Sequence, residues 1–198
     1  MERVSRAAAA RRRTPAACVG RLPRIVLETD RLLLRRATID DIDELVAIHA
    51  DPDLIRFHGS WDRAKALDWL AQVDRNWQEH GYGRIAIADR ASGHLLGRTG
   101  IMYLGQFAET ELGWTLRREA WGHGYATEAA RACADWAFRD FAIPYLTALI
   151  EPENVRSIRV AGRLGMTRLR DDVYEDRAMI VHSVTRETWL SPRSSGPA

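Results

Sequence analysis

The order of predicted elements indicates a mixed α+β domain in which helices cover a mostly antiparallel sheet. The chain has 198 residues, of which 46% are hydrophobic and 28% charged, and this composition suits a single globular domain with a substantial core. Strand-like and helix-like hydrophobic periods follow one another in the order β α α β β β α β α β β, without an internal repeat. We therefore expect about seven strands and about four flanking helices.

The first third of the chain predicts one strand and two helices. Residues 25–36 have a strand-like pattern with a turn at Glu28–Asp30. Thr38 followed by Asp41 is an N-cap pattern, and it predicts the start of an amphipathic helix. A second helix is expected at about 63–78, where leucine, valine and tryptophan recur on one face.

An antiparallel meander is expected in the middle of the chain. Its three strands are predicted at 83–89, 95–104 and 109–116. Turn residues separate the first two strands at Ser92–Gly93 and the last two at Gly105–Gln106. Such short connections join strands that run in opposite directions.

The last third of the chain adds two helices and three strands. A helix is expected from the glycine loop at Gly122–Gly124 to about residue 139, and its alanines at helical spacing imply close packing on a sheet. The remaining elements are a strand at 145–150, a helix at 155–164 closed by Gly165, and strands at 167–174 and 179–186.

Both ends of the chain differ in composition from the domain expected at 25–190. Residues 1–24 contain seven arginines and one acidic residue, and we expect a disordered Arg/Ala-rich tail there. A targeting segment or a nucleic-acid-binding arm is the alternative interpretation of this tail. Residues 191–198, with two Pro and three Ser, are expected to be a disordered C-terminal tail.

Composition also restricts the partners. Outside the basic tail the chain carries 22 basic and 26 acidic residues, so the domain has no general footprint for nucleic acid. No run of 18 apolar residues predicts a membrane span. Two cysteines, Cys18 and Cys133, are too few for a disulfide framework or a zinc site. We expect a cytoplasmic protein with no metal.

A glycine loop before the third predicted helix is the most informative motif. Gly122, His123 and Gly124 precede that helix, and a loop at a helix N-terminus presents backbone N–H groups to a phosphate or pyrophosphate. The dinucleotide-binding fingerprint fails because Thr127 occupies its third glycine position. A Walker loop is also absent from the sequence, because no Gly-Lys-Ser or Gly-Lys-Thr occurs. A plain turn remains the alternative to ligand binding.

A second cluster of polar residues lies between the strand at 145–150 and the next helix. Asn154 is a natural N-cap, and Ser157 lies three residues further on. A purely structural cap is one interpretation. In the other, the Asn154 amide contacts a ligand and the Ser157 hydroxyl faces a reacting centre.

Together these motifs resemble the GNAT superfamily of N-acetyltransferases, in particular the RimJ/RimL-like branch of ribosomal-protein N-terminal acetyltransferases. The resemblance covers about residues 27–189. Its motifs are Glu28-Thr-Asp-Arg-Leu-Leu-Leu-Arg35, Glu111-Leu-Gly-Trp114, Trp121-Gly-His-Gly-Tyr-Ala126 with Thr127-Glu-Ala129, and Pro152-Glu-Asn154-x-x-Ser157 before Leu164-Gly-Met166. Their shared order and spacing make the resemblance specific.

The resemblance implies a GNAT-like sheet that is splayed between its fourth and fifth predicted strands, and it implies acetyl-CoA as co-substrate. Trp114 and Leu116 would pair their backbone with the pantetheine arm. The residues implied to surround the rest of the cofactor are Trp121, Gly122, His123, Gly124, Tyr125, Ala126, Thr127, Asn154 and Ser157. The broad superfamily has Gln or Arg where this chain has Trp121, and this is a mild departure because the contacts there are mainly made by backbone.

Acyl transfer to an amine requires a proton acceptor, because an amine with a pKa of about 10 is mostly charged at pH 7. The family motif places Glu111 beside the thioester as the preferred base, with Glu151 second and Glu109 third. A backbone N–H at Trp114 would meet the oxyanion. Many GNAT members place a tyrosine acid seven residues after the asparagine, where this chain has Ala161. Ser157 is therefore the candidate that assists the departing thiolate.

The leading interpretation is an acetyl-CoA-dependent N-acetyltransferase that acts on a primary amine, either of a small molecule or of a protein N-terminus. A CoA-binding regulatory or interaction module without turnover is the alternative. The expected walls of the acceptor site are residues 57–61 and 171–176, and the acidic run in the second segment would attract a cationic acceptor. The sequence leaves the acceptor unassigned and a homodimer open.

Overall fold

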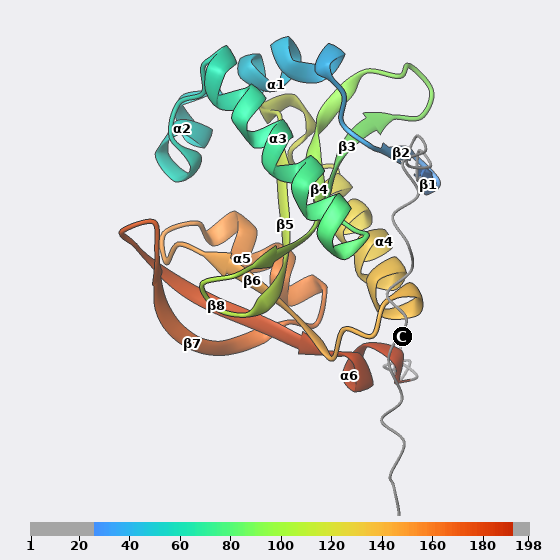
Figure 1. Cartoon of the computed structure of the whole chain (residues 1–198), viewed down its shortest axis with the longest axis vertical. Helices are drawn as coiled ribbons and strands as arrows, with labels where there is room; N and C mark the ends of the chain where they lie inside the picture. The colour runs from blue at the N-terminus through green and yellow to red at the C-terminus, as the bar shows by residue number, and fades with distance from the viewer. Residues whose placement is uncertain (1–25, 192–198) are drawn as a thin grey trace, which may run out of the picture.

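The computed structural model describes residues 26–191, so the predicted tails at 1–24 and 191–198 lie outside the described residues except for Ser191. One mixed sheet carries eight strands in the order β1-β2-β3-β4-β5-β6-β8-β7 (Figure 1). The strands are β1 (Val26–Glu28), β2 (Leu32–Arg35), β3 (Arg84–Asp89), β4 (Leu95–Leu104), β5 (Glu109–Leu116), β6 (Tyr145–Ile150), β7 (Thr167–Tyr174) and β8 (Arg177–Thr185). All neighbouring strands are antiparallel except the parallel pair β5 and β6. The predicted fold class is confirmed.

The described part of the chain holds six α-helices and two short 3-10 turns. The helices are α1 (Ile42–Ile48), α2 (Pro52–His58), α3 (Arg63–His80), α4 (Tyr125–Asp140), α5 (Val155–Arg163) and α6 (Arg186–Leu190), and the 3-10 turns are Ile39–Asp41 and Arg118–Ala120. The prediction of about four helices missed α2 and α6. Both are short, but each has a readable N-cap: the side chain of Asp51 accepts from the N–H of Asp53, and that of Thr185 accepts from the N–H of Thr188.

The expectation of seven strands is also corrected by one. Residues 25–36 were predicted as a single strand with a turn, but the chain reverses there and forms a hairpin in which Leu27 pairs with Leu34. The turn is closed by the N–H of Thr29, which donates to the carbonyl of Leu32 at 3.0 Å. A turn that reverses direction divides one predicted strand into two.

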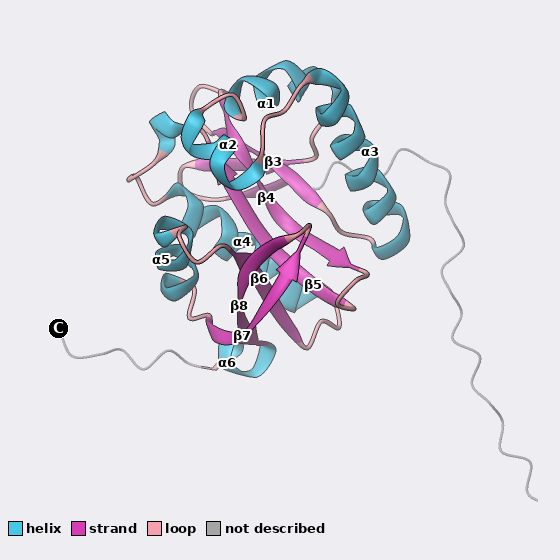
Figure 2. Ribbon diagram, turned by 90° about the vertical axis from the view of Figure 1, so that its left-hand side faces the viewer, coloured by secondary structure: helices cyan, strands magenta, loops and turns pink. Residues whose placement is uncertain are grey.

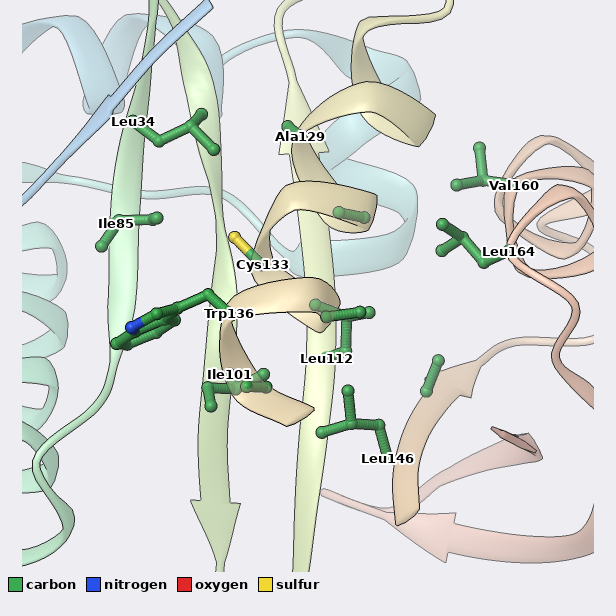
Figure 3. Close-up of a cluster of buried hydrophobic side chains, with 14 of the residues drawn as sticks. Leu34, Ile85, Ile101, Leu112, Ala129, Cys133, Trp136, Leu146, Val160 and Leu164 are labelled. Atoms are coloured by element: carbon green, nitrogen blue, oxygen red, sulfur yellow. The ribbon is translucent and has the colours of Figure 1, made fainter. Parts of the chain in front are cut away.

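Helix α4 packs its small residues on one face of the sheet. Figure 3 shows Ala129, Cys133 and Trp136 of α4 turned toward Leu34 and Ile85 of the strands. Their side chains are almost fully buried, and removing such apolar surface from water contributes about 25 cal/mol per Å². Burial also raises the pKa of the Cys133 thiol to about 12, so this cysteine is a packing residue and not a nucleophile.

Helix α1 covers the other face of the sheet, and α3 packs against both clusters, with Trp69 and Leu70 beside α1 and with Val73 and Trp77 in the cluster of α4. Ala86 of β3 packs with Leu45 and Ile48 of α1, whereas its neighbours Ile85 and Ile87 pack with α4, because successive side chains of a strand point to opposite faces. Figure 2 shows α3 on one side of the molecule and α5 on the other.

The sheet splays between β5 and β6. These strands share a single paired position, Glu111 with Thr147, and beyond it they separate. This is the splay that the resemblance implied. It opens a gap beside the second half of β5, where Trp114 and Leu116 lie.

Candidate active site

Two cavities meet at the splay. The larger has a volume of about 910 Å³ and lies between β5, the loop before α4, helix α5 and helix α2. The smaller has a volume of about 440 Å³ and lies between β4, β5, the segment between α2 and α3, and the hairpin of β7 and β8. Both are lined by Phe57, His58, Trp114, Thr115, Asn154 and Ser157. A ligand in one cavity can therefore reach a ligand in the other.

The structure brings every residue predicted to hold the cofactor onto the larger cavity. These residues are Trp114, Leu116, Trp121, Gly122, His123, Gly124, Tyr125, Ala126, Thr127, Asn154 and Ser157. They come from β5, from the loop before α4, from the first turn of α4 and from the start of α5.

The loop before α4 owes its shape to two glycines with left-handed backbone. Gly122 and Gly124 both have φ of +81°, a region that L-residues with a side chain enter at a cost. Gly124 is also the N-cap of α4. The first N–H groups of a helix have no intrahelical partner, and they lie at the positive end of its dipole. The loop therefore offers backbone donors and a positive field to an anion.

A residue from the other end of the domain holds this loop. Arg31, in the turn between β1 and β2, donates through Nη1 to the carbonyl oxygen of His123 at 2.9 Å. Its guanidinium also pairs with Glu128 of α4 at 2.5 Å and lies 4.5 Å from the ring centroid of Tyr125. Thr29 donates to the same Glu128 carboxylate at 2.5 Å. The turn thus fastens both the loop and the first turn of α4.

The larger cavity fits an anionic cofactor that also needs hydrogen bonds. The hydroxyl of Thr127 lines it, is buried, and has no hydrogen-bond partner among residues 26–191, so a ligand there would satisfy it. Four arginines line the same cavity, namely Arg56, Arg156, Arg159 and Arg163. Sequence reasoning missed them, although the arginines of α5 recur at i, i+3 and i+7, a spacing that puts them on one face of the helix.

The backbone of β5 faces the gap at Trp114. The N–H of Arg117 donates to the carbonyl of Leu96 on β4 at 2.8 Å. Since backbone groups of successive residues point to alternate sides in an antiparallel pair, those of Trp114 and Leu116 point away from β4. The carbonyl of Leu116 already accepts from Nε1 of Trp121 at 2.7 Å. Two groups of Trp114, its N–H and its C=O, therefore face the gap together with the N–H of Leu116. They could form hydrogen bonds with an extended ligand that lies along β5.

Asn154 caps helix α5. Its Oδ1 accepts from the N–H of Ser157 at 3.1 Å, which is the structural role expected of an N-cap. Both side chains nevertheless line the two cavities. The cap orients the first turn of α5 so that the Ser157 hydroxyl stands at the junction of the cavities.

Glu111, the preferred candidate base, is held by a buried arginine. Its Oε2 accepts from Nη2 of Arg84 on β3, and the side chains are 14% and 8% exposed. Gly113 makes this contact possible, because a Cβ there would lie 2.7 Å from Arg84 Nη1. Sequence reasoning missed Arg84, since only the pairing of β3, β4 and β5 places it beside Glu111.

The two other candidate carboxylates are also paired. Glu151 accepts from Arg177 at 2.7 Å and lines the smaller cavity. Glu109 accepts from Arg170 at 2.9 Å, and it lines neither of the two cavities. The geometry therefore separates Glu111 and Glu151, which a substrate could reach, from Glu109.

The predicted acceptor walls line the smaller cavity in part. Phe57, His58 and Trp61 do so on one side, and Tyr174 and Glu175 do so on the other, whereas the three aspartates of the segment 171–176 do not line it. Burial and the charge of Arg98 lower the pKa of His58 to about 3, so this ring is neutral near pH 7. Burial and the charges of Glu175 and Glu111 raise the pKa of Tyr174 to about 12, so its hydroxyl keeps its proton.

A splayed sheet with a loop at a helix N-terminus that offers backbone donors to an anion, next to a second cavity, is the arrangement expected of an acyltransferase that takes its acyl group from a coenzyme A thioester. Comparison with known proteins agrees with this class. Residues 31–167 match the family model described as "Acetyltransferase (GNAT) domain". The chain belongs to the GNAT family and is an acetyl-CoA-dependent acyltransferase.

The similar proteins extend over most of the chain. The uncharacterized protein YkkB of Bacillus subtilis (strain 168) is 35% identical over 71% of this chain and 84% of its own length. An acetyltransferase from Agrobacterium tumefaciens str. C58 has a TM-score of 0.73 and 29% identity, and covers 87% of this chain and 98% of its own. A protein from Vibrio cholerae, described as a "putative ribosomal-protein-serine acetyltransferase", has a TM-score of 0.69 and 25% identity, and covers 82% of this chain and 98% of its own.

Two further findings concern the described residues 26–191. No helix in this range is both long and apolar enough to cross a membrane. No group of three or more His, Cys, Asp or Glu side chains in this range is arranged to hold a metal ion.

Proposed function

We propose that the protein transfers the acetyl group of acetyl-CoA to a primary amine by direct attack of the amine on the thioester. The observation that carries this proposal is the position of Trp114. Its backbone faces the gap beside β5, where the larger cavity and the smaller cavity share their lining residues. The cofactor would occupy the larger cavity and the amine the smaller, with the thioester carbonyl between them.

The chemistry requires three protein groups near the carbonyl. The amine nitrogen forms a bond to the carbonyl carbon, and the resulting oxyanion accepts a hydrogen bond from the backbone N–H of Trp114. The carbon–sulfur bond then breaks. Glu111 would accept the amine proton, directly or through water, on Oε1, because Arg84 engages Oε2. The Ser157 hydroxyl would donate toward the departing thiolate, which finally takes a proton.

Within the GNAT family we place the chain in the RimJ/RimL-like branch, in a reducing cytoplasm. The similarity to the Vibrio cholerae protein and the motifs around Trp121 and Asn154 support this placement. The alternative is a CoA-binding module without turnover. The presence of Ser157 at the junction of the two cavities and of Glu111 in the smaller one favours the enzyme.

Thermal unfolding tests the cofactor half of this proposal. Acetyl-CoA should raise the melting temperature, while NAD and ATP should not. A ligand at a hundredfold excess over its dissociation constant adds about 2.7 kcal/mol of stability. A thiol-release assay with a panel of amines tests the transfer half. Stabilisation by acetyl-CoA without thiol release for any amine would favour the module without turnover.

A further inference from the structure

An arginine of β4 lies inside the cavity that we assign to the acceptor. The guanidinium of Arg98 lines the 440 Å³ cavity. It lies 5.1 Å from the ring centroid of Trp61 and 5.4 Å from that of Trp69. These aromatic contacts hold the guanidinium in place but bring no negative charge.

The polar neighbour of Arg98 is neutral. Nη2 of Arg98 lies 3.4 Å from Nε2 of His49. His49 donates through Nδ1 to the carbonyl of Leu45 at 2.8 Å, which leaves Nε2 as the acceptor. Burial and the charge of Arg98 lower the pKa of His49 to about 3. The ring is therefore uncharged near pH 7 and orients the guanidinium without neutralising it.

Arg98 has no carboxylate partner within the described part of the chain. The other two arginines of the cavity are paired, Arg84 with Glu111 and Arg177 with Glu151. Arg98 makes no ion pair among residues 26–191, and its Nε is buried there without a hydrogen-bond partner. Burial and the charge of Arg84 lower the pKa of Arg98 to about 9, and the charge of Glu111 opposes this shift. Because Glu111 is paired with Arg84, it compensates the charge of Arg98 only in part, and an anionic ligand would lower the remaining cost.

We infer that the acceptor is an amine that carries an anionic group, a carboxylate or a phosphate, near its amino group, and that Arg98 binds this group. The inference rests on the proposed function. Arg98 is paired with Thr115, the residue that follows Trp114 on β5. The anion would thus be bound one strand away from the thioester. The planar guanidinium matches both carboxylate and phosphate. Free amino acids and aminoalkyl phosphates belong to this class.

The acidic residues near the cavity are only partly paired. Asp171 pairs with Arg168 at 2.6 Å and Asp172 pairs with Arg170 at 2.9 Å, but neither aspartate lines the cavity. The lining itself carries Asp68 and Glu175 as well as Lys65 and Arg98. Arg98, and not the overall charge of the cavity, is therefore the feature that points to an anionic group.

A binding experiment tests the inference without turnover. Thermal unfolding is measured with CoA and a panel of N-acetyl-L-amino acids, which mimic products, and with the corresponding amides. The acids should raise the melting temperature of the wild type, and this shift should disappear in Arg98→Met. Lys65→Met is the matched control, because Lys65 also lines the cavity but is exposed and donates to the carbonyl of Ser60.

A stability measurement separates ligand binding from a structural role. Without ligand, Arg98→Met should melt at or above the temperature of the wild type, because it removes a charge that Glu111 compensates only in part. A structural role for Arg98 predicts the opposite, a lower melting temperature. Acids and amides that stabilise the wild type equally would overturn the inference.

Kinetics gives the second test. The wild type should acetylate amino acids and phosphoethanolamine with at least tenfold higher kcat/KM than amino acid amides and ethanolamine. Arg98→Met should remove this preference, and Arg98→Lys should retain part of it. Equal efficiency with amides or with tripeptides would contradict the inference, because these lack an anionic group near the amine. Absence of any acetyl-CoA shift and of thiol release with every amine would instead contradict the proposed function.

Discussion

Arg31 donates to the carbonyl oxygen of His123 at 2.9 Å, and this hydrogen bond joins residues 92 positions apart in the chain. It anchors the glycine loop from outside, since the loop itself has few side chains that could hold its shape. The same guanidinium pairs with Glu128. The cofactor site therefore depends on a turn at the edge of the sheet that touches no substrate.

Arg31→Ala is expected to weaken acetyl-CoA binding by roughly fivefold to tenfold. A hydrogen bond of a charged group contributes about 1.5–3 kcal/mol, and exposure of the Arg31 side chain reduces this figure. Isothermal titration calorimetry measures the affinity. Arg90→Ala is the control, because Arg90 contacts the same turn through the carbonyl of Thr29 but not the loop. Equal effects of the two changes would show that the anchor does not act on the cofactor.

Gly124→Val is expected to abolish the acetyl-CoA shift, because a β-branched side chain would block the approach of the anion. The φ of +81° adds a backbone cost of about 1–2 kcal/mol, so the variant should also be less stable while remaining folded. Gly93→Val separates the two effects. Gly93 has φ of +74°, and a Cβ there would have no neighbour within 4 Å. Retention of the acetyl-CoA shift in Gly124→Val would refute a phosphate-binding loop.

Glu111→Gln is expected to lower turnover by roughly 10²- to 10⁴-fold and to recover in part at high pH, where the amine deprotonates without help. Acetyl-CoA affinity should remain, because Glu111 lines only the smaller cavity. Glu109→Gln is the control, since it removes an ion-paired carboxylate of the same strand that lies outside both cavities. Full activity of Glu111→Gln from pH 6 to 9 would transfer the role of base to Glu151.

Ser157→Ala is expected to lower turnover only modestly and with little rescue by pH. A thiol with a pKa near 8.5 is already a tolerable leaving group, so help from a hydroxyl changes the barrier by a small amount. The backbone cap from Ser157 to Asn154 survives the substitution. Rates are compared in single-turnover experiments, and an unchanged rate would remove Ser157 from the mechanism.

The free energy of unfolding should fall as the pH decreases below about 6.5, in part because of His49. Its pKa is about 3 in the folded protein, through burial and the charge of Arg98, against 6.5 when unfolded. The unfolded state therefore binds more protons than the folded state between these pH values. As a result, the free energy of unfolding falls by about 2 kcal/mol by pH 5. Urea unfolding at pH 7 and pH 5 should show a smaller loss for His49→Gln. An identical loss would assign the effect to other groups.

Much of this architecture follows from local sequence. The turn chemistry at Ser92–Gly93 and Gly105–Gln106 predicted the meander of β3, β4 and β5, and the structure confirms its antiparallel pairing. The small residues of α4 predicted close packing, and they are buried. Local signals suffice here because a short connection permits few strand arrangements and the helical period sets the buried face. The residues of the glycine loop that we predicted to hold the cofactor line one cavity for the same reason, since a loop and the helix that it opens are contiguous.

Long-range contacts decided the rest. No local pattern shows that Arg84 would hold Glu111, that Arg31 would fasten His123, or that Arg98 would lack a carboxylate partner within the described residues. Each of these relations joins residues brought together by strand order and register, and a shift of one residue in register would turn the side chains to the other face. The sequence by itself determined most of the elements and the place of the glycine loop before α4. Only the tertiary structure decided which charges meet, because pairing in space depends on the fold and not on distance along the chain.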